Sequence, residues 1–267
     1  MAPPAAARAP QLQKDPPHAW AQAEAAGGGQ EAGGLRDAEK RGAAHGIDLC
    51  FADEAGFAMT LPPCYSWSPL GTPVSVAYEA PQGRRVNALG AYFSHGPQAG
   101  RFVHEVYANL PKSQAKKQRK TPEQIARDHG LSEAEVGPID SGRFLRFVWR
   151  VAGRPAVYLS GWRRERPLVL VLDNYSVHSS QPVQEALPQL AAADVFLFYL
   201  PSYSPELSQI EPIWNSVKHH EMPVRSYTVA GDLKRAVEEA LARKAQSLLA
   251  ERLQETQKTT NQLCAAT

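Results

Sequence analysis

Three acidic residues lie at places in this sequence where apolar segments end. Asp53 closes the segment LCFAD, and Asp173 closes the segment LVLVLD. Glu211 follows a loop rich in Ser and Pro, at the point where a helix is predicted to begin. Mg²⁺ takes oxygen ligands and usually keeps several waters, so a few carboxylates are enough to bind it. These three acids make metal-assisted phosphodiester chemistry the leading hypothesis.

Acids so far apart in the sequence can act together only if the fold gathers the elements that carry them. The segments that end at Asp53 and Asp173 are apolar at nearly every position, which is typical of strands covered on both faces. Other segments show the periods of amphipathic helices. Strands are predicted over residues 47–53, 84–95, 100–108, 168–173 and 194–200, and helices over residues 141–153, 181–192, 211–220 and 229–254.

The order of these elements, three strands followed by alternating helices and strands, is that of the ribonuclease-H-like fold. We therefore expect an α/β protein with a mixed five-stranded sheet and flanking helices. In that fold the first and fourth strands are parallel neighbours, so Asp53 and Asp173 would lie close together. Active sites of open α/β sheets gather at the C-terminal ends of strands, which agrees with this placement.

Composition divides the chain into segments of different character. Residues 1–45 are rich in Ala, Gly and Pro, and we expect a linker or a disordered lead-in there. Residues 46–254 are expected to form the catalytic domain, with a polar, basic insertion at about 109–138. Residues 255–267 are expected to be a tail.

Composition also argues against several classes of protein. The 43% of apolar residues can supply a core. Cys50, Cys64 and Cys264 lack metal-ligand spacing, and their odd number argues against a disulfide framework. No apolar run approaches the ~18 residues of a membrane span, and the N-terminus lacks the apolar segment of a signal peptide. We expect a cytoplasmic protein that does not associate with membranes.

The formal net charge is only +2, but the basic residues are unevenly distributed. Two clusters are candidates for contacts with DNA phosphates. The alternative interpretation of the first cluster is a solvated loop. The clusters consist of Lys112, Lys116, Lys117, Arg119 and Lys120, and of Arg163, Arg164 and Arg166.

Four segments resemble, in the right order, the catalytic domain of mariner-type DDE transposases, and in particular their bacterial insertion-sequence branch. The resemblance covers roughly residues 46–245. Between Asp173 and Glu211 lie 37 residues, within the range that such enzymes use for their last two acids. The segments are FADEAGF (51–57), TLPPCYSWSPLGTPV (60–74), LVLDNYSVH (170–178) and LPSYSPELSQIEPIWNSVK (200–218).

The resemblance implies roles for individual residues. Asp53, Asp173 and Glu211 become the three catalytic acids and the ligands of two Mg²⁺ or Mn²⁺ ions. Asp53 would bridge the two ions, and the other two acids would each hold one of them. Asn174 and His178 are expected to contact these metal ligands without binding the metal themselves, or to shape the turn that carries the ligands.

Other interpretations of the acids stay open at this point. Glu206 is a rival third acid. Glu54 alternates away from Asp53 along the strand, so only one of the two can face the metals. Ser208 and Glu211 also fit a capping box, in which Glu211 would only cap a helix. Pro212 argues against that role, because a residue before proline avoids helical geometry.

The resemblance implies a DDE transposase catalytic domain that cleaves transposon ends and joins a 3′-hydroxyl to target DNA. Double-stranded DNA would be its partner and a homodimer its active assembly. Full-length members carry helix-turn-helix modules before this domain, and residues 1–45 cannot encode them, so we expect a truncated or split-frame product. One alternative is a catalytically silent remnant that binds DNA or a partner subunit. Another is a ribonuclease H or junction resolvase on the same fold.

Overall fold

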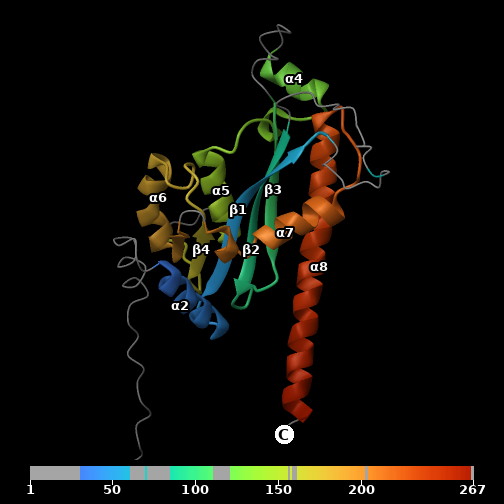
Figure 1. Cartoon of the computed structure of the whole chain (residues 1–267). Helices are drawn as coiled ribbons and strands as arrows, with labels where there is room; N and C mark the ends of the chain where they lie inside the picture. Colours follow the sequence, from blue (N-terminus) through green and yellow to red (C-terminus); the bar gives the residue numbers. More distant parts are fainter. Residues whose placement is uncertain are drawn as a thin grey trace, which may run out of the picture.

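A five-stranded sheet lies at the centre of the molecule, with helices on both faces (Figure 1). The computed structural model describes residues 31–60, 70, 85–110, 121–155, 157, 161–201 and 204–265 of the 267.

The strand order of the sheet is β3-β2-β1-β4-β5. β1 (Asp48–Ala58) pairs antiparallel with β2 (Arg85–His95), and β2 pairs antiparallel with β3 (Phe102–Asn109). β1 pairs in parallel with β4 (Leu168–Leu172), and β4 in parallel with β5 (Val195–Tyr199). This mixed sheet with flanking helices has the ribonuclease-H-like fold, which confirms the fold predicted from the order of the elements.

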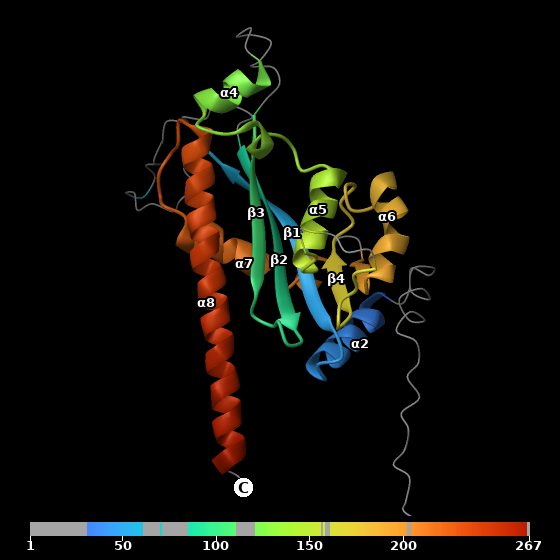
Figure 2. The same ribbon diagram turned by 180° about the vertical axis from the view of Figure 1, so that it is seen from behind.

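Two groups of helices cover the two faces of the sheet. α5 (Ser141–Val151) and α6 (Gln181–Ala192) contribute to the core on one face. α2 (Glu31–Ala43), α7 (Glu211–Ser216) and α8 (Ala230–Ala265) contribute to the core on the other. Figure 2 shows from behind that α8 runs along β3. A short π-helical segment, η3 (Val217–Glu221), continues α7.

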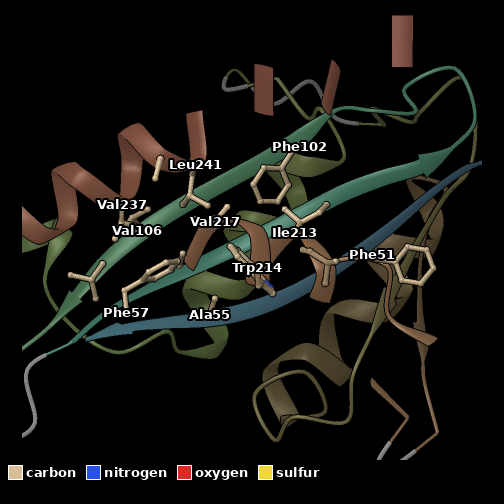
Figure 3. Close-up of a cluster of buried hydrophobic side chains, with 14 of the residues drawn as sticks. Phe51, Ala55, Phe57, Phe102, Val106, Ile213, Trp214, Val217, Val237 and Leu241 are labelled. Atoms are coloured by element: carbon tan, nitrogen blue, oxygen red, sulfur yellow. The ribbon is translucent and has the colours of Figure 1, made fainter. Parts of the chain in front are cut away.

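The side chains of β1 alternate between two apolar cores, so both faces of this strand are buried. Phe51, Ala55 and Phe57 belong to the core beneath α7 and α8, where Figure 3 shows them with Trp214. Cys50 and Ala52 belong to the core beneath α5 and α6. Because side chains alternate along a strand, a charged residue in β1 must face one of these two helical layers.

The segment expected to be a linker is partly helical. α2 lies within residues 1–45, and its Leu35 and Ala38 are buried against the core. Glu39, one residue further on, accepts a hydrogen bond from Gln209 at 3.2 Å. The expectation of a lead-in up to residue 45 is therefore wrong for this helix, because a short apolar stripe suffices once the sheet offers a surface for it. Residues 1–30 lie outside the described residues.

α8 is longer than the predicted helix over 229–254. Its 36 residues extend to Ala265 and give a length of about 54 Å. Leu233, Val237 and Leu241 are fully buried against the sheet, but the residues from Leu253 to Gln262 are exposed. Figures 1 and 2 both show this end of α8 projecting past the sheet. The segment expected to be a tail thus continues the helix.

The insertion between β3 and α5 contains α4 (Pro122–Asp128) and the short helix η1 (Glu133–Glu135). Lys234 of α8 forms an ion pair with Glu135 at 2.8 Å, which attaches this insertion to the domain. No helix in the described part of the chain combines the length and apolar character needed to cross a bilayer.

Candidate active site

The parallel pairing of β1 with β4 brings two of the acids level with each other. Phe51 pairs with Val171, so Asp53 and Asp173 lie level two residues further along. Neighbouring strands are about 4.8 Å apart. β4 ends at Leu172, and Asp173 begins the following loop, whereas β1 continues to Ala58 beside β2. β1 is therefore longer than the predicted strand over 47–53, because β2 supplies a partner for its second half.

A close approach between α7 and the sheet positions the third acid. Gly90 of β2 lies opposite Asp53 in the antiparallel ladder. A Cβ atom on Gly90 would lie 2.5 Å from the ring of Trp214, so only glycine allows this contact. Trp214 also packs edge-on against Phe102, with ring centroids 5.8 Å apart. Glu211 precedes Trp214 by one helical turn, and this docking places Glu211 on the side of the sheet that Asp53 faces.

The start of α7 differs from a capping box. The residue before the helix is Ile210, which makes no side-chain cap, and Glu211 is the first helical residue with Pro212 next to it. The carboxylate of Glu211 is therefore not the N3 partner of Ser208. An acid in the first turn of a helix also interacts favourably with the helix dipole.

Electrostatic effects connect all three acids. Burial raises the pKa of Asp53 to about 6, and the negative charges of Asp173 and Glu211 contribute to this rise. A hydrogen bond with the backbone of Glu54 and the charge of His178 act in the opposite direction. Asp53 thus experiences the charges of two acids that come from two other elements of the fold.

His178 holds the side chain of Asp173. Its Nδ1 atom lies 2.9 Å from Asp173 Oδ1, and its ring is only 1% exposed. This contact, followed by a hydrogen bond from the backbone N–H of Tyr175, lowers the pKa of Asp173. The ring of His178 packs on buried Phe144 with centroids 4.5 Å apart, and Tyr199 donates its hydroxyl hydrogen to the His178 carbonyl at 2.8 Å. His178 therefore fixes the orientation of Asp173 from the core side.

Asn174 acts on the backbone of the same turn. Its Nδ2 donates to the carbonyl of Leu200 at 2.5 Å, and the N–H of Leu200 donates to the carbonyl of Leu172 at 2.8 Å. These two hydrogen bonds tie the loop after β4 to the end of β5. The side chain of Asn174 thus shapes the turn that carries Asp173.

The two rival acids do not share the position of Asp53, although Glu54 is close enough for the charges of Asp53 and Asp173 to act on it. Glu54 pairs across the ladder with Leu89, which belongs to the core beneath α5, so Glu54 faces away from Asp53 and α7. Burial raises the pKa of Glu54 to about 7. Glu206 is exposed on a single turn of 3₁₀ helix, η2 (Pro205–Leu207).

The donor set suits a hard divalent cation. Carboxylate oxygens are the ligands that Mg²⁺ and Ca²⁺ take, and a cation among the three acids would offset the repulsion that adds to the effect of burial on the pKa of Asp53. Among the residues that the structure describes, no three His, Cys, Asp or Glu side chains are already arranged to hold one metal ion. In this arrangement the Asp173 carboxylate is turned toward His178 and the Tyr175 N–H.

Of the two predicted basic clusters, the structure describes only the second. The first, between Lys112 and Lys120, lies outside the described residues. The second precedes β4 and so lies at the end of that strand opposite to Asp173, about 16 Å away. Arg164 is 7% exposed and pairs with buried Asp48 at 2.5 Å, so the expectation that it contacts DNA is wrong. Arg163 pairs with Asp194, and Arg166 is exposed.

Three other basic side chains, which the sequence clusters did not include, surround the far half of β1. Arg85 is paired with Ala58 in the ladder, and Lys218 lies 5.8 Å from the centre of the Phe57 ring. Arg225 lies 4.7 Å from the centre of the Tyr227 ring, and the N–H of Tyr227 bonds to the carbonyl of Met59. All three basic side chains are exposed. They come from three separate segments of the chain, so no run of charges indicated them.

Comparison with protein families gives a match over residues 143–234 to the family described as DDE superfamily endonuclease. The matched segment runs from α5 into α8 and lies after Asp53 in the chain. Comparison with curated proteins gives no significant match.

Solved structures of similar shape include complexes of the Mos1 transposase. The mariner Mos1 paired end complex with Mg is 14% identical with a TM-score of 0.49, and the match covers 91% of this chain and 64% of that chain. The Mos1 Strand Transfer Complex is 13% identical with a TM-score of 0.47, and the match covers 81% of this chain and 57% of that chain. The present chain therefore spans less than two thirds of those transposase chains. Asp173 and Glu211 both lie in the segment that matches the DDE superfamily endonucleases.

Proposed function

We propose that this chain is the catalytic domain of a mariner-type DDE transposase, which cleaves DNA at transposon ends and joins a 3′-hydroxyl to target DNA. The observation that carries the proposal is the gathering of Asp53, Asp173 and Glu211 from three separate elements at the end of the β1–β4 ladder. The endonuclease family match over residues 143–234 supports the same chemistry.

Asp53, Asp173 and Glu211 are the residues that would hold the metal, as Mg²⁺ or Mn²⁺ and with two ions expected. When bound, such ions lower the pKa of an attacking water or hydroxyl and stabilise the charge that develops on the leaving oxygen. The chain itself supplies orientation. His178 fixes one carboxylate, and Trp214 seats the helix that begins at Glu211 on the sheet.

The proposed substrate is double-stranded DNA, with a homodimer as the active assembly. Arg85, Lys218 and Arg225 are exposed along the part of β1 that continues beyond Asp53. Phe57, beside Lys218, lies about 13 Å along the strand from Asp53. Cations at this distance suit phosphates that flank the reacting one, and their neutralisation of the backbone releases counterions.

Cleavage of DNA by variants of the acids tests the proposal. Asp53→Asn, Asp173→Asn and Glu211→Gln keep the size of each side chain and remove its charge. We expect each to lower nicking of a supercoiled plasmid in Mg²⁺ or Mn²⁺ at least 100-fold while circular dichroism spectra stay unchanged. Glu206→Gln is the matched control and should remain active.

Each of the other outcomes has a definite meaning. An active Glu211→Gln together with an inactive Glu206→Gln would refute the assignment of the third acid. A wild-type chain that nicks no DNA in either metal would refute catalysis and leave a silent, DNA-binding remnant. Preferential cleavage of RNA–DNA hybrids or four-way junctions would favour a ribonuclease H or a resolvase.

A further inference from the structure

An exposed aromatic ring lies beside Asp173. Tyr175 is 48% exposed. Its N–H donates to Asp173 Oδ1 at 3.1 Å, and its carbonyl accepts from the N–H of His178 at 2.9 Å. These backbone hydrogen bonds fix Tyr175 next to an acid of the candidate site without burying its side chain.

Three aromatic rings form a continuous column from the core to this surface. Phe144 is fully buried and packs on the ring of His178 with centroids 4.5 Å apart. The ring of His178 meets that of Tyr175 at an interplanar angle of 79°, with centroids 5.8 Å apart. Because this contact is edge-on, it covers at most one face of the Tyr175 ring. The outermost ring of the column therefore keeps a face for another planar group.

The flat aromatic ring of Tyr175 distinguishes it from the other exposed apolar side chains. Among the large apolar side chains that the described part of the chain exposes, Tyr175 is the aromatic one, and the remaining ones are Leu and Val. A flat ring at the surface suits stacking, whereas a branched aliphatic chain does not. The free energy of stacking depends little on the identity of the base, because every base has a π-face.

A nucleobase offers a free face only where its own stack is interrupted. Inside a duplex both faces of each base are covered by neighbours, whereas a base at a strand end or an unpaired base has an open face. If the acids cleave DNA as proposed, separation of the cleaved strand would produce such an end, and Tyr175 lies beside Asp173 in the same turn. We infer that Tyr175 stacks on the nucleobase adjacent to the cleaved phosphodiester and holds the strand end at the acids. This inference rests on the proposed function and extends it to a substrate contact.

Fluorescence of 2-aminopurine tests the stacking directly. The probe is a duplex with one unpaired 2-aminopurine at a 3′ end, bound by the full chain in Ca²⁺, and the control probe carries 2-aminopurine inside the duplex. We expect the wild type and Tyr175→Phe to quench the terminal base, and Tyr175→Ala and Tyr175→Leu to leave it bright. Tyr175→Ala should bind the end-containing duplex about tenfold more weakly.

Controls separate this role from structure and from catalysis. Leu253→Ala removes a similarly exposed side chain at the far end of α8 and should behave as the wild type. Quenching by Tyr175→Ala at the wild-type level, or a Tyr175→Phe that fails like Tyr175→Ala, would overturn the stacking role. A wild type that cleaves DNA without quenching the terminal base also overturns it and leaves the proposed function standing. Quenching that depends on Tyr175, in a protein that cleaves no DNA, would support the stacking role and refute the proposed catalytic function.

Discussion

Asp53 is a carboxylate in a place that disfavours its charge. Burial, with the charges of Asp173 and Glu211, raises its pKa from 3.8 to about 6. A carboxyl whose pKa is higher in the folded than in the unfolded state stabilises the fold below the unfolded pKa, and this contribution is lost as the pH rises through the folded pKa. In the absence of metal, the stability that Asp53 contributes is therefore present below about pH 4 and absent above about pH 6.

Asp53→Asn should remove this dependence. We expect the variant to raise the free energy of unfolding of the metal-free protein at pH 7.5 by about 1–3 kcal/mol, since one pKa unit corresponds to about 1.4 kcal/mol. At pH 4 the two proteins should differ little. Urea unfolding in EDTA at both pH values measures the difference, with the exposed Asp37→Asn as the control. An equal change at both pH values would contradict this explanation.

His178 acts on the site through Asp173, so its removal should affect metal binding. His178→Ala is expected to weaken binding of Mn²⁺ by about 10–100-fold, the usual cost of losing a group that orients a metal ligand. Titration calorimetry with the full chain measures this affinity. Phe144→Leu is the matched control, because it disturbs the same stack but leaves the contact between His178 and Asp173 in place. A similar weakening in both variants would indicate that His178 matters only for packing.

At the scale of elements, the contact between α7 and β2 decides where Glu211 lies. The ring of Trp214 occupies the space above Gly90, directly opposite Asp53. Even with η3, which continues it, α7 forms a short helical segment, so its own hydrogen bonds are not enough to hold it in place. Its position depends on the packing of Trp214 and of buried Ile213, which Figure 3 shows among the core side chains.

Gly90→Ala should therefore displace α7. Overpacking of this kind costs about 1–3 kcal/mol, and we expect cleavage to fall by more than the reduced fraction of folded protein explains. Gly56→Ala in the adjacent strand is the control, because the nearest atom to its new Cβ would be 3.7 Å away. Thermal unfolding and plasmid nicking give the two measurements. If both variants nick DNA equally well, the contact with Trp214 does not position Glu211.

At the scale of the whole molecule, the distribution of charge over the surface is more informative than the net charge. The net charge of +2 would not by itself predict binding to a polyanion. Exposed basic side chains nevertheless lie near the far half of β1, while Arg164, at the opposite end of the strands, is used in a buried ion pair.

Substitution of Arg85, Lys218 and Arg225 together by Ala should weaken binding to any duplex. The dependence of log K on log salt should become shallower by about 0.9 for each phosphate that the variant no longer neutralises. Fluorescence anisotropy with an arbitrary duplex over a range of NaCl concentrations measures the slope. Arg166→Ala, at the other end of β4, should leave the slope unchanged. A larger effect of Arg166→Ala than of the triple variant would place the DNA at the opposite end of the strands.

Local patterns in the sequence were enough to predict the order of strands and helices along the domain, and the fold that this order indicated placed Asp53 and Asp173 close together. Hydrophobic periodicity is a property of neighbouring residues, so it can be read in a single chain without knowledge of its tertiary contacts. Residues 112–120, part of a predicted DNA-binding surface, lie outside the described structure and remain a prediction.

Other features were decided only by contacts between residues far apart in the chain. The extension of β1 to Ala58 needs β2 as a partner, the helix α2 needs a core on which to bury Leu35, and the burial of Arg164 needs Asp48. The packing of Trp214 on Gly90 and the aromatic column that ends at Tyr175 also depend on contacts between distant parts of the chain. Each such contact forms only when two segments that are far apart in the sequence come together in the fold. The hydrophobic pattern of either segment alone therefore cannot predict it.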